Sequence, residues 1–309
     1  MNKLNVDAII VVGLNRSGTK WLSNILSLNN DVAAVTLPHQ FGILESNALN
    51  DFSRVFKNID RDDDYAGFVC MWAETDYVRS TGFDRSYLLS WQPRPKSVFA
   101  ALSRLLDDFR QKQGKSIWLQ KCSPSQSRQF QKELASPAKV VAIRRNFNRI
   151  LESSIALKQQ TGVGSSFLRD LVINAIQERI LADVSKQPNT MTVDFESLKA
   201  EPEATVRKVC EFIGIEFSRT MLKTPFEQNT SFEKKTRTKI GPFKRLVSLC
   251  VRSLFALLPV GLVNWMWAES RARAPLAIVR KTYHELLTEA SSSSQSLDPD
   301  LQNDDLEDR

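Results

Sequence analysis

Short apolar runs alternate along this chain with longer stretches whose apolar residues recur at helical spacing. The short runs are rich in Val, Ile, Leu and Ala and cover residues 8–12, 32–35, 116–119, 140–143 and 191–195. Buried parallel strands leave such runs, and crossover helices leave the periodic stretches between them. The pattern therefore predicts an α/β fold, doubly wound, with a mainly parallel sheet flanked by helices.

Four of the intervening stretches carry a clear helical stripe, at residues 21–26, 98–109, 167–176 and 202–213. The third stripe consists of Phe167, Leu168, Leu171, Val172, Ala175 and Ile176. The fourth begins at Pro202 and is followed by Gly214. Proline is favoured at the first position of a helix and glycine just after the last, so we expect this helix to begin and end there.

The pattern changes after residue 215. Residues 233–245 are basic, and residues 254–267 are apolar apart from Asn264. Fourteen apolar residues are too few to cross a bilayer, which needs about twenty. Two alternatives stay open: a buried helical element, or an interfacial segment flanked by cations that contacts a membrane surface through residues 246–267.

Three parts follow from this organisation. Residues 1–232 are expected to form the α/β domain, and residues 233–289 a helical C-terminal extension. Residues 290–309 hold four consecutive serines and six acidic residues and are expected to be a disordered tail.

Charge narrows the class of ligand. The chain of 309 residues has a net charge of +7, but the acidic tail leaves 41 basic and 29 acidic residues, a net charge of +12, on residues 1–289. Such a surplus favours an anionic ligand, whether nucleotide, nucleic acid or membrane surface. No nucleic-acid-binding motif is recognisable, so we do not expect a nucleic-acid partner.

Cysteine usage and the N-terminal sequence bear on the compartment. The four cysteines are scattered and form no metal-binding pattern with the two histidines, so we expect free buried thiols and no metal site. The first residues run into a strand pattern without a charged leader. We therefore expect a cytoplasmic protein, with membrane association as the alternative that the apolar segment leaves open.

The turn after the first predicted strand is the strongest chemical signal. Gly13 and Gly18 are separated by four residues, as in a Walker A motif, and a helical stripe follows. A strand, a glycine turn and a helix N-terminus together hold phosphate, so the loop is P-loop-like. The next residues are Thr19 and Lys20, the reverse of the Walker order, which removes the lysine and hydroxyl that a kinase or ATPase needs. The cation lies instead inside the loop, at Arg16.

Residues 16–22 (RSGTKWL) resemble the 5′-phosphosulfate loop of the sulfotransferases that use 3′-phosphoadenosine 5′-phosphosulfate (PAPS), particularly the tyrosylprotein and bacterial carbohydrate branches. Two further segments match in order. Residues 138–153 form an apolar strand that ends in Arg145 and Asn146, with Ser153 eight positions after the arginine, and are similar to the family's 3′-phosphate site. Residues 193–198, with 212–215, resemble a scaffold segment of the same family.

The resemblance implies transfer of a sulfuryl group from PAPS to a hydroxyl or amine, with no metal and no covalent intermediate. It assigns the nucleotide to Arg16, Ser17, Gly18, Thr19, Lys20, Trp21, Arg145 and Ser153. The sequence departs from the family at Phe147, usually proline, and at Arg149, often acidic. Which of Arg144, Arg145 and Arg149 makes the main phosphate contact therefore stays open.

The resemblance also implies catalytic residues. Arg16 neutralises the leaving phosphate, and Lys121, after the third predicted strand, stabilises the transferring group. The family's base lies near residues 37–39, where His39 is the one group that titrates near neutrality. Many relatives have a glutamate where this chain has Leu37 and Pro38, so Glu45 is the alternative base.

Several functions are compatible with these residues. The first is sulfuryl transfer to a glycan or glycolipid. The alternatives are a phosphotransferase that uses Mg-ATP and a non-catalytic protein that binds nucleotide or docks on a membrane. The aromatic residues of the segment 52–91 are expected to wall the acceptor pocket; they include Trp72, Tyr77, Phe83, Tyr87 and Trp91.

Overall fold

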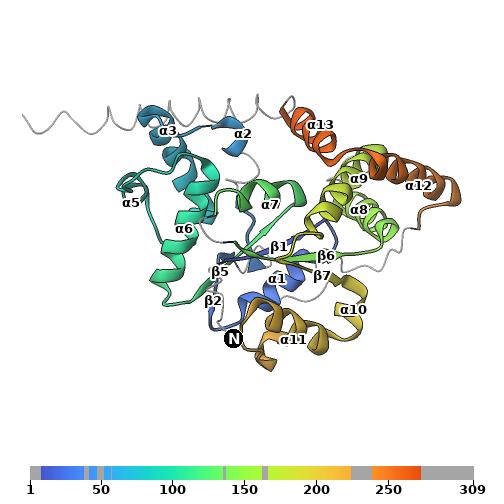
Figure 1. Ribbon diagram of the computed structural model, residues 1–309, viewed down its shortest axis with the longest axis horizontal. Helices are drawn as coiled ribbons and strands as arrows, with labels where there is room; N and C mark the ends of the chain where they lie inside the picture. Colours follow the sequence, from blue (N-terminus) through green and yellow to red (C-terminus); the bar gives the residue numbers. More distant parts are fainter. Residues whose placement is uncertain are drawn as a thin grey trace, which may run out of the picture.

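The computed structural model describes residues 8–37, 42–46, 52–56, 58–134, 137–161, 166–223 and 239–272, and in this part of the chain five parallel strands form the central sheet (Figure 1). Their order is β2-β5-β1-β6-β7. The strands are β1 (Ala8–Gly13), β2 (Val32–Ala34), β5 (Ile117–Cys122), β6 (Lys139–Arg144) and β7 (Thr190–Asp194). All five coincide with the predicted runs, and the doubly wound parallel fold is confirmed.

The central strand β1 is buried along its whole length because helices cover both faces of the sheet. Successive side chains point to opposite faces. Accordingly, Ile10 and Val12 belong to one hydrophobic core, and Ile9 and Val11 to the other.

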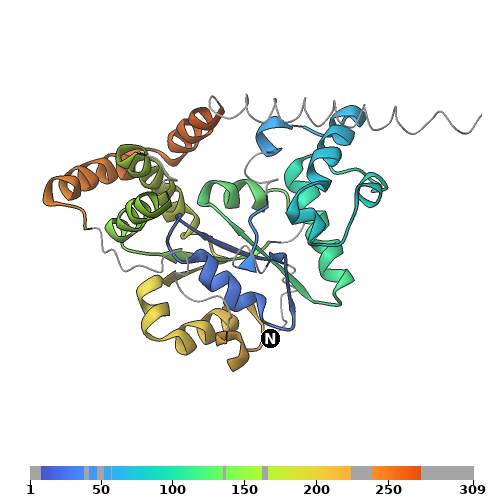
Figure 2. The ribbon, with the colours of Figure 1, turned by 180° about the vertical axis from the view of Figure 1, so that it is seen from behind.

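Figures 1 and 2 show the two helical layers. One layer holds α1 (Thr19–Ser27), α10 (Phe195–Ala200), α11 (Pro202–Ile213) and the 3₁₀ turn η3 (Arg219–Leu222). The other holds α6 (Val98–Lys112), α7 (Pro124–Gln131), α8 (Phe147–Thr161) and α9 (Phe167–Val184). The short elements β3 (Thr36–Leu37), β4 (Gly42–Ile43), α2 (Ser53–Val55), α3 (Asp62–Ala73), α4 (Asp76–Arg79) and α5 (Arg85–Leu89) lie between β2 and α6 in the chain.

The predicted helical stripes differ in accuracy. The stripe of α6 is buried at every predicted position, from Val98 to Phe109. In α9 the prediction is wrong for Leu168 and Val172, which are 62% and 39% exposed. The reason is that α9 packs against four helices, α7, α8, α12 and α13, so its buried residues do not follow one stripe, and Leu168 and Val172 lie on a part of the helix surface that these neighbours leave uncovered.

The C-terminal extension forms two helices, α12 (Pro242–Leu257) and α13 (Val260–Ala272). They are separated at Leu258, which adopts the extended backbone that a following proline, here Pro259, favours. Arg252 makes two hydrogen bonds of 2.7 Å to the Glu178 carboxylate and so fastens α12 to α9. The chain therefore turns sharply at the edge of the α9 layer.

The prediction that residues 254–267 form a buried helical element is wrong for most of their large apolar side chains. Phe255 and Val263 are buried, but Leu254, Leu257, Leu262 and Trp265 are 58%, 85%, 42% and 62% exposed. Within the described residues no single helix is long and apolar enough to cross a membrane. Together, α12 and the part of α13 up to Ala268 have the length and apolar composition of a membrane span, but the two helices are bent by 112° relative to each other.

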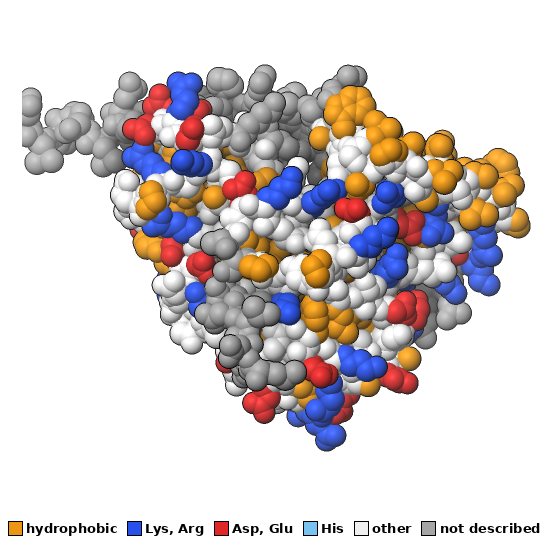
Figure 3. Space-filling view, viewed as in Figure 1, with side chains coloured by type: hydrophobic (Ala, Val, Ile, Leu, Met, Phe, Trp, Pro, Cys, Tyr) orange, Lys and Arg blue, Asp and Glu red, His pale blue; other side chains and the backbone are white. Residues whose placement is uncertain are grey.

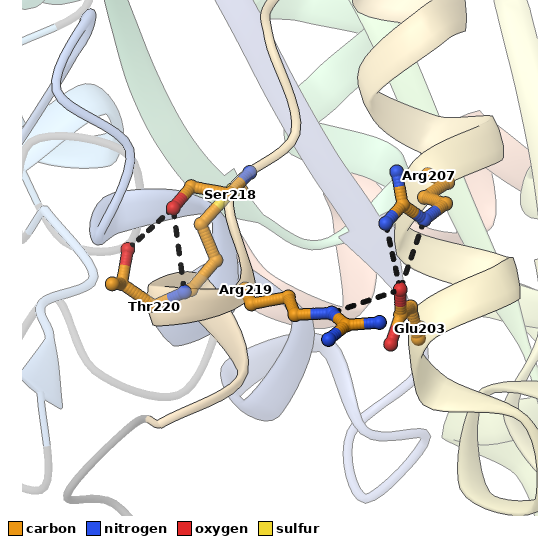
Figure 4. A network of polar contacts seen from close by, with 6 residues as sticks. Glu203, Arg207, Ser218, Arg219 and Thr220 are labelled. Atoms are coloured by element: carbon orange, nitrogen blue, oxygen red, sulfur yellow. Dashed lines mark hydrogen bonds and ion pairs between the residues drawn. The ribbon is translucent and has the colours of Figure 1, made fainter.

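In the layer that contains α1, polar contacts join α11 to η3 (Figure 4). Arg207 donates to Glu203 Oε1 at 2.7 Å, and Arg219 Nε lies 3.5 Å from the same oxygen. The Ser218 side chain caps η3 by accepting from Thr220 N at 3.3 Å. The network is solvent-exposed, so it fixes the path of the chain more than it stabilises the fold.

The four cysteines are free thiols. Cys122 and Cys210 are buried, and burial raises the pKa of Cys122 to about 12 and that of Cys210 to about 11. Cys70 is half-buried, and Cys250, on α12, is exposed. The expectation of buried thiols therefore holds for two of the four.

Helix α11 ends, as predicted, at Gly214, whose φ of 84° lies in the left-handed region. Replacing Gly214 with Ala should lower the free energy of unfolding by about 1 kcal/mol, because a Cβ is disfavoured at this φ although the space around it is open. Urea denaturation measures the change.

Gly261→Ala is the matched control. Gly261 also has open space around it, but it lies within helix α13 and its φ is not left-handed. The free energy of unfolding of this variant should not fall, because alanine is favoured over glycine in a helix. Equal losses in the two variants would contradict the assignment of the effect to backbone conformation.

Candidate functional site

The site lies where the carboxyl ends of three neighbouring strands meet. Strand β1 is paired with β6 on one side and β5 on the other, with Gly13 opposite Ile143 and Val11 opposite Lys121. The loop after β1 is therefore next to Arg145, two residues beyond Ile143, and next to Lys121. In open α/β sheets this edge, where the strand order reverses, is the usual place of ligand binding.

The loop from Gly13 to Gly18 is a tight turn. Ser17 N donates to Leu14 O at 3.1 Å, and Arg16 adopts a left-handed φ of 67°. Gly18, with φ 97°, precedes the first turn of α1. The loop thus leads directly into a helix N-terminus, as a phosphate-binding loop requires.

Both glycines of the loop are required by close approach. A Cβ on Gly13 would lie 2.6 Å from Ser17 Oγ and 2.8 Å from Ile143 O. A Cβ on Gly18 would lie 2.4 Å from the Phe195 ring. The loop is therefore packed against β6 and the start of α10, without room for a side chain.

Three predicted nucleotide residues form one hydrogen-bonded cluster. Arg145 Nη1 donates to Arg16 O at 2.7 Å, and Arg16 Nε donates to Ser153 Oγ at 3.1 Å. The cluster joins the loop after β1, the end of β6 and the second turn of α8. The structure thus brings together the residues that the resemblance assigns to the 5′ and 3′ ends of the nucleotide.

The electrostatics of the cluster suit an anion. Partial burial lowers the pKa of Arg16, and the charge of Arg145 lowers it further. Burial also lowers the pKa of Arg145, with Glu196 and Glu152 acting in the opposite direction. Two partly desolvated cations side by side are unfavourable by themselves and gain from an anionic ligand between or beside them.

Orphaned polar atoms provide an independent test of whether these residues fit a phosphorylated ligand. Ser17 is fully buried, and its Oγ has no hydrogen-bond partner within the described ranges. Arg145 Nε, also buried, lacks one too. Since buried polar groups are normally satisfied, donors of this kind beside a helix N-terminus fit a phosphate or sulfate oxygen.

Of the three candidate arginines, the structure brings Arg145 alone into contact with the loop. Arg149 Nη1 donates instead to Glu152 at 3.1 Å on its own helix. Arg144 is exposed and lines a cavity between α9 and α12. The alternation of side chains at a strand end accounts for this difference, because neighbouring residues point to opposite faces of the sheet.

Phe195 is a site residue that the sequence reasoning treated as scaffold. The Arg145 guanidinium lies 4.3 Å from its ring centroid, and Trp21 meets the ring edge-on at 6.1 Å. Phe195 thus holds Arg145, Gly18 and Trp21 at fixed positions. The available signal was its place directly after the fifth strand, at the same edge of the sheet.

A second polar cluster lies beside the first. Lys121, buried at the end of β5, forms an ion pair with Glu45. Lys20, on the first turn of α1, is close enough for their charges to act on it: burial and Lys121 lower the pKa of Lys20, and Glu45 raises it. Two lysines and a carboxylate therefore meet next to the loop. Thr19, which precedes Lys20, is buried.

The other candidate base, His39, lies outside the described residues. Glu45 is thus the candidate whose surroundings the structure describes.

The expected aromatic walls of an acceptor pocket are largely core residues. Trp72, Tyr77 and Trp91 are buried, so their assignment to an open pocket is wrong. Phe83 and Tyr87 stack at 4.2 Å and are partly buried against the same core. These rings belong to the core that also holds Ile10 and Trp118 of the sheet, so they pack α3, α4 and α5 onto the domain.

Among the described residues, no group of three or more His, Cys, Asp or Glu side chains is arranged to hold a metal ion.

The chain is similar to known proteins in sequence and in fold. A family model described as "Sulfotransferase family" matches residues 8–219. The sulfotransferase domain from the curacin biosynthetic pathway has a TM-score of 0.50 at 13% identity, covering 87% of this chain and 98% of that domain. The sulfotransferase domain of the Synechococcus PCC 7002 olefin synthase has a TM-score of 0.50 at 15% identity, and the match covers 89% of this chain and 98% of that domain. No curated protein sequence matches significantly. At these identities the structural likeness establishes the fold.

Replacing Arg145 with Gln should weaken the binding of adenosine 3′,5′-bisphosphate about tenfold or more, because a charge-assisted hydrogen bond is lost from a partly buried site. Arg149→Gln, which removes an equal charge four residues away, should change the affinity by less than about threefold. Isothermal titration calorimetry measures both. The reverse ranking would show that the phosphate contact belongs to Arg149.

Proposed function

The chain belongs to the sulfotransferase family, whose model matches residues 8–219, and from this premise we propose that it transfers the sulfuryl group of PAPS to a hydroxyl or amine of an acceptor. The observation that carries the proposal is the cluster of Arg16, Arg145 and Ser153 beside the orphaned Oγ of Ser17. It offers donors for two separate phosphate groups of one nucleotide, from the β1 loop and from the β6–α8 segment.

The proposed reaction is an in-line displacement at sulfur. The acceptor oxygen or nitrogen forms a bond to sulfur while the bond from sulfur to the 5′-phosphate oxygen breaks, and the acceptor proton passes to a base. Arg16 and the amides of residues 17–19 neutralise the charge that develops on the leaving phosphate. Lys121 and Lys20 face the same region and stabilise the oxygens of the transferring group.

We assign the base to Glu45, with His39 as the alternative. Glu45 is held by its ion pair with Lys121, so a proton acceptor and a cation stand side by side at the carboxyl end of β5. General-base catalysis requires such proximity to the reacting group. The acceptor that we propose is a glycan or glycolipid, whose hydroxyl or amine would approach from the Glu45 side.

Phosphoryl transfer from Mg-ATP is disfavoured by the order of Thr19 and Lys20. Thr19 follows Gly18 at the position of the Walker lysine. Lys20 lies one position later, where the charges of Lys121 and Glu45 act on it. Calorimetry separates the two functions: we expect heat on titration with adenosine 3′,5′-bisphosphate and none with Mg-ATP. Binding of Mg-ATP alone would overturn the proposal.

Glu45→Gln and Lys121→Met should each lower the rate of ³⁵S transfer from labelled PAPS by about 10²–10⁴-fold, the usual contribution of a general base or of a charge-stabilising donor. Crude glycan and glycolipid fractions serve as acceptors. His39→Asn, measured in parallel, tests the alternative base.

Glu211→Gln and Lys208→Met are the matched controls, because both residues are exposed on α11 in the opposite layer. They should keep full activity. If Glu45→Gln is as active as these controls while His39→Asn is inactive, the base is His39; if all variants are active, the catalytic assignment fails.

A further inference from the structure

Helix α12 exposes apolar residues on the side turned away from the protein. Phe243, Leu246, Leu249, Leu254 and Leu257 are between 58% and 85% exposed. Leu246, Leu249, Cys250, Ser253, Leu254 and Leu257 stand at positions i, i+3, i+4, i+7, i+8 and i+11 of the helix, so they share one face. A surface helix normally carries charged residues there. The opposite face is already packed on α9 through Phe255, so α12 is apolar on both sides.

The exposed apolar surface continues onto α13. Leu262 and Trp265 are 42% and 62% exposed. Figure 3 shows orange side chains gathered over α12 and α13, and Figure 1 shows both helices at the rim of the molecule. A contiguous patch of this kind marks an interaction site. We call the exposed apolar residues of α12 and α13 the rim patch.

Charge selects the partner of the rim patch. Residues 239–272, which include both helices, contain five cations and one acidic residue, Glu269. A two-fold contact between two copies would therefore bring mainly like charges together. An anionic surface complements them.

A basic cavity opens between α12 and α9, beside Leu249. It has a volume of about 440 Å³ and is lined by Leu249 and Ser253 of α12, by four cations and by one carboxylate, Glu178. The cations are Arg144 of β6, Arg179 of α9, Lys186 just after α9, and Arg252 of α12. Arg252 is paired with Glu178, so the lining keeps a positive surplus. An anionic headgroup would fit here when the leucines lie in an apolar phase.

We propose that the rim patch docks the protein on the surface of an anionic membrane, with Leu249 and Leu257 inserted among the acyl chains and a lipid phosphate near Lys186. Neither α12 nor α13 alone is long and apolar enough to span a bilayer, and the two are bent by 112° relative to each other. We therefore infer that they lie at the membrane surface. Aliphatic residues on a projecting helix, an exposed tryptophan and flanking cations are the features of interfacial helices. The proposal is independent of the sulfuryl-transfer activity.

The test is co-sedimentation of the full chain with phosphatidylcholine vesicles that contain 30% phosphatidylserine. We expect binding that is at least tenfold stronger than to pure phosphatidylcholine and that weakens as salt is raised. Leu249→Gln with Leu257→Gln should reduce binding at least tenfold. Both residues are exposed, so the thermal unfolding temperature should not fall. Leu28→Gln, an exposed leucine of α1 in the opposite layer, is the matched control and should bind like the parent.

A charge reversal tests the cavity separately. Lys186→Glu should lower affinity for the anionic vesicles about fivefold or more, and Lys208→Glu on α11 should leave it unchanged. The proposal is overturned if the parent does not sediment with anionic vesicles, or if it binds neutral vesicles equally well. It is also overturned if the leucine double variant binds like the parent, or if sedimentation velocity shows a dimer that this variant alone abolishes.

Sulfuryl transfer to a soluble acceptor should be unchanged in the leucine and Lys186 variants. A failure of docking and a failure of the enzymatic proposal therefore give different results.

Discussion

Two guanidinium groups held side by side at the edge of the sheet determine how the rest of the site is organised. Arg16 and Arg145 are partly buried. Burial lowers the pKa of each, and the charge of Arg145 lowers the pKa of Arg16 further. The fold supports this arrangement with fixed acceptors: Arg16 O for Arg145 and Ser153 Oγ for Arg16. Because the protein already holds the two cations close together, the site is preorganised for an anion, and the ligand needs to induce little rearrangement.

Strand register is what brings the two arginines together. Residues 16 and 145 are far apart in the chain, but β1 and β6 are adjacent, with Gly13 opposite Ile143. The same logic places Lys121 beside the loop through the pairing of β1 with β5. A one-residue shift of either pairing would turn the basic side chains to the other face of the sheet, so the buried apolar residues of β1 also fix the position of the charges.

The sequence predicted all five strands of the sheet, because continuous apolar runs are a direct signal of strands covered on both faces. The resemblance to the family assigned Arg16, Arg145 and Ser153 to one nucleotide, and the structure joins them in one hydrogen-bonded cluster. Prediction from the sequence failed where a residue's surroundings depend on several distant elements. Leu168 and Val172 continue a helical stripe but are exposed, because the four helices that pack on α9 leave this part of it uncovered. Trp72 and Trp91 suggested a pocket wall but lie in the hydrophobic core. The position of Phe195 at the end of a strand was a weak signal, because its role depends on the glycine and the arginine that it contacts.

The contact between Gly18 and Phe195 has an evolutionary consequence. The ring occupies the volume that any side chain at position 18 would need, with 2.4 Å between the ring and an added Cβ. A smaller residue at 195 would open that volume, but it would leave the arginine without its stacking surface, and the left-handed backbone at Gly18 would still disfavour a side chain. Among descendants of this sequence, we therefore expect both positions to be retained.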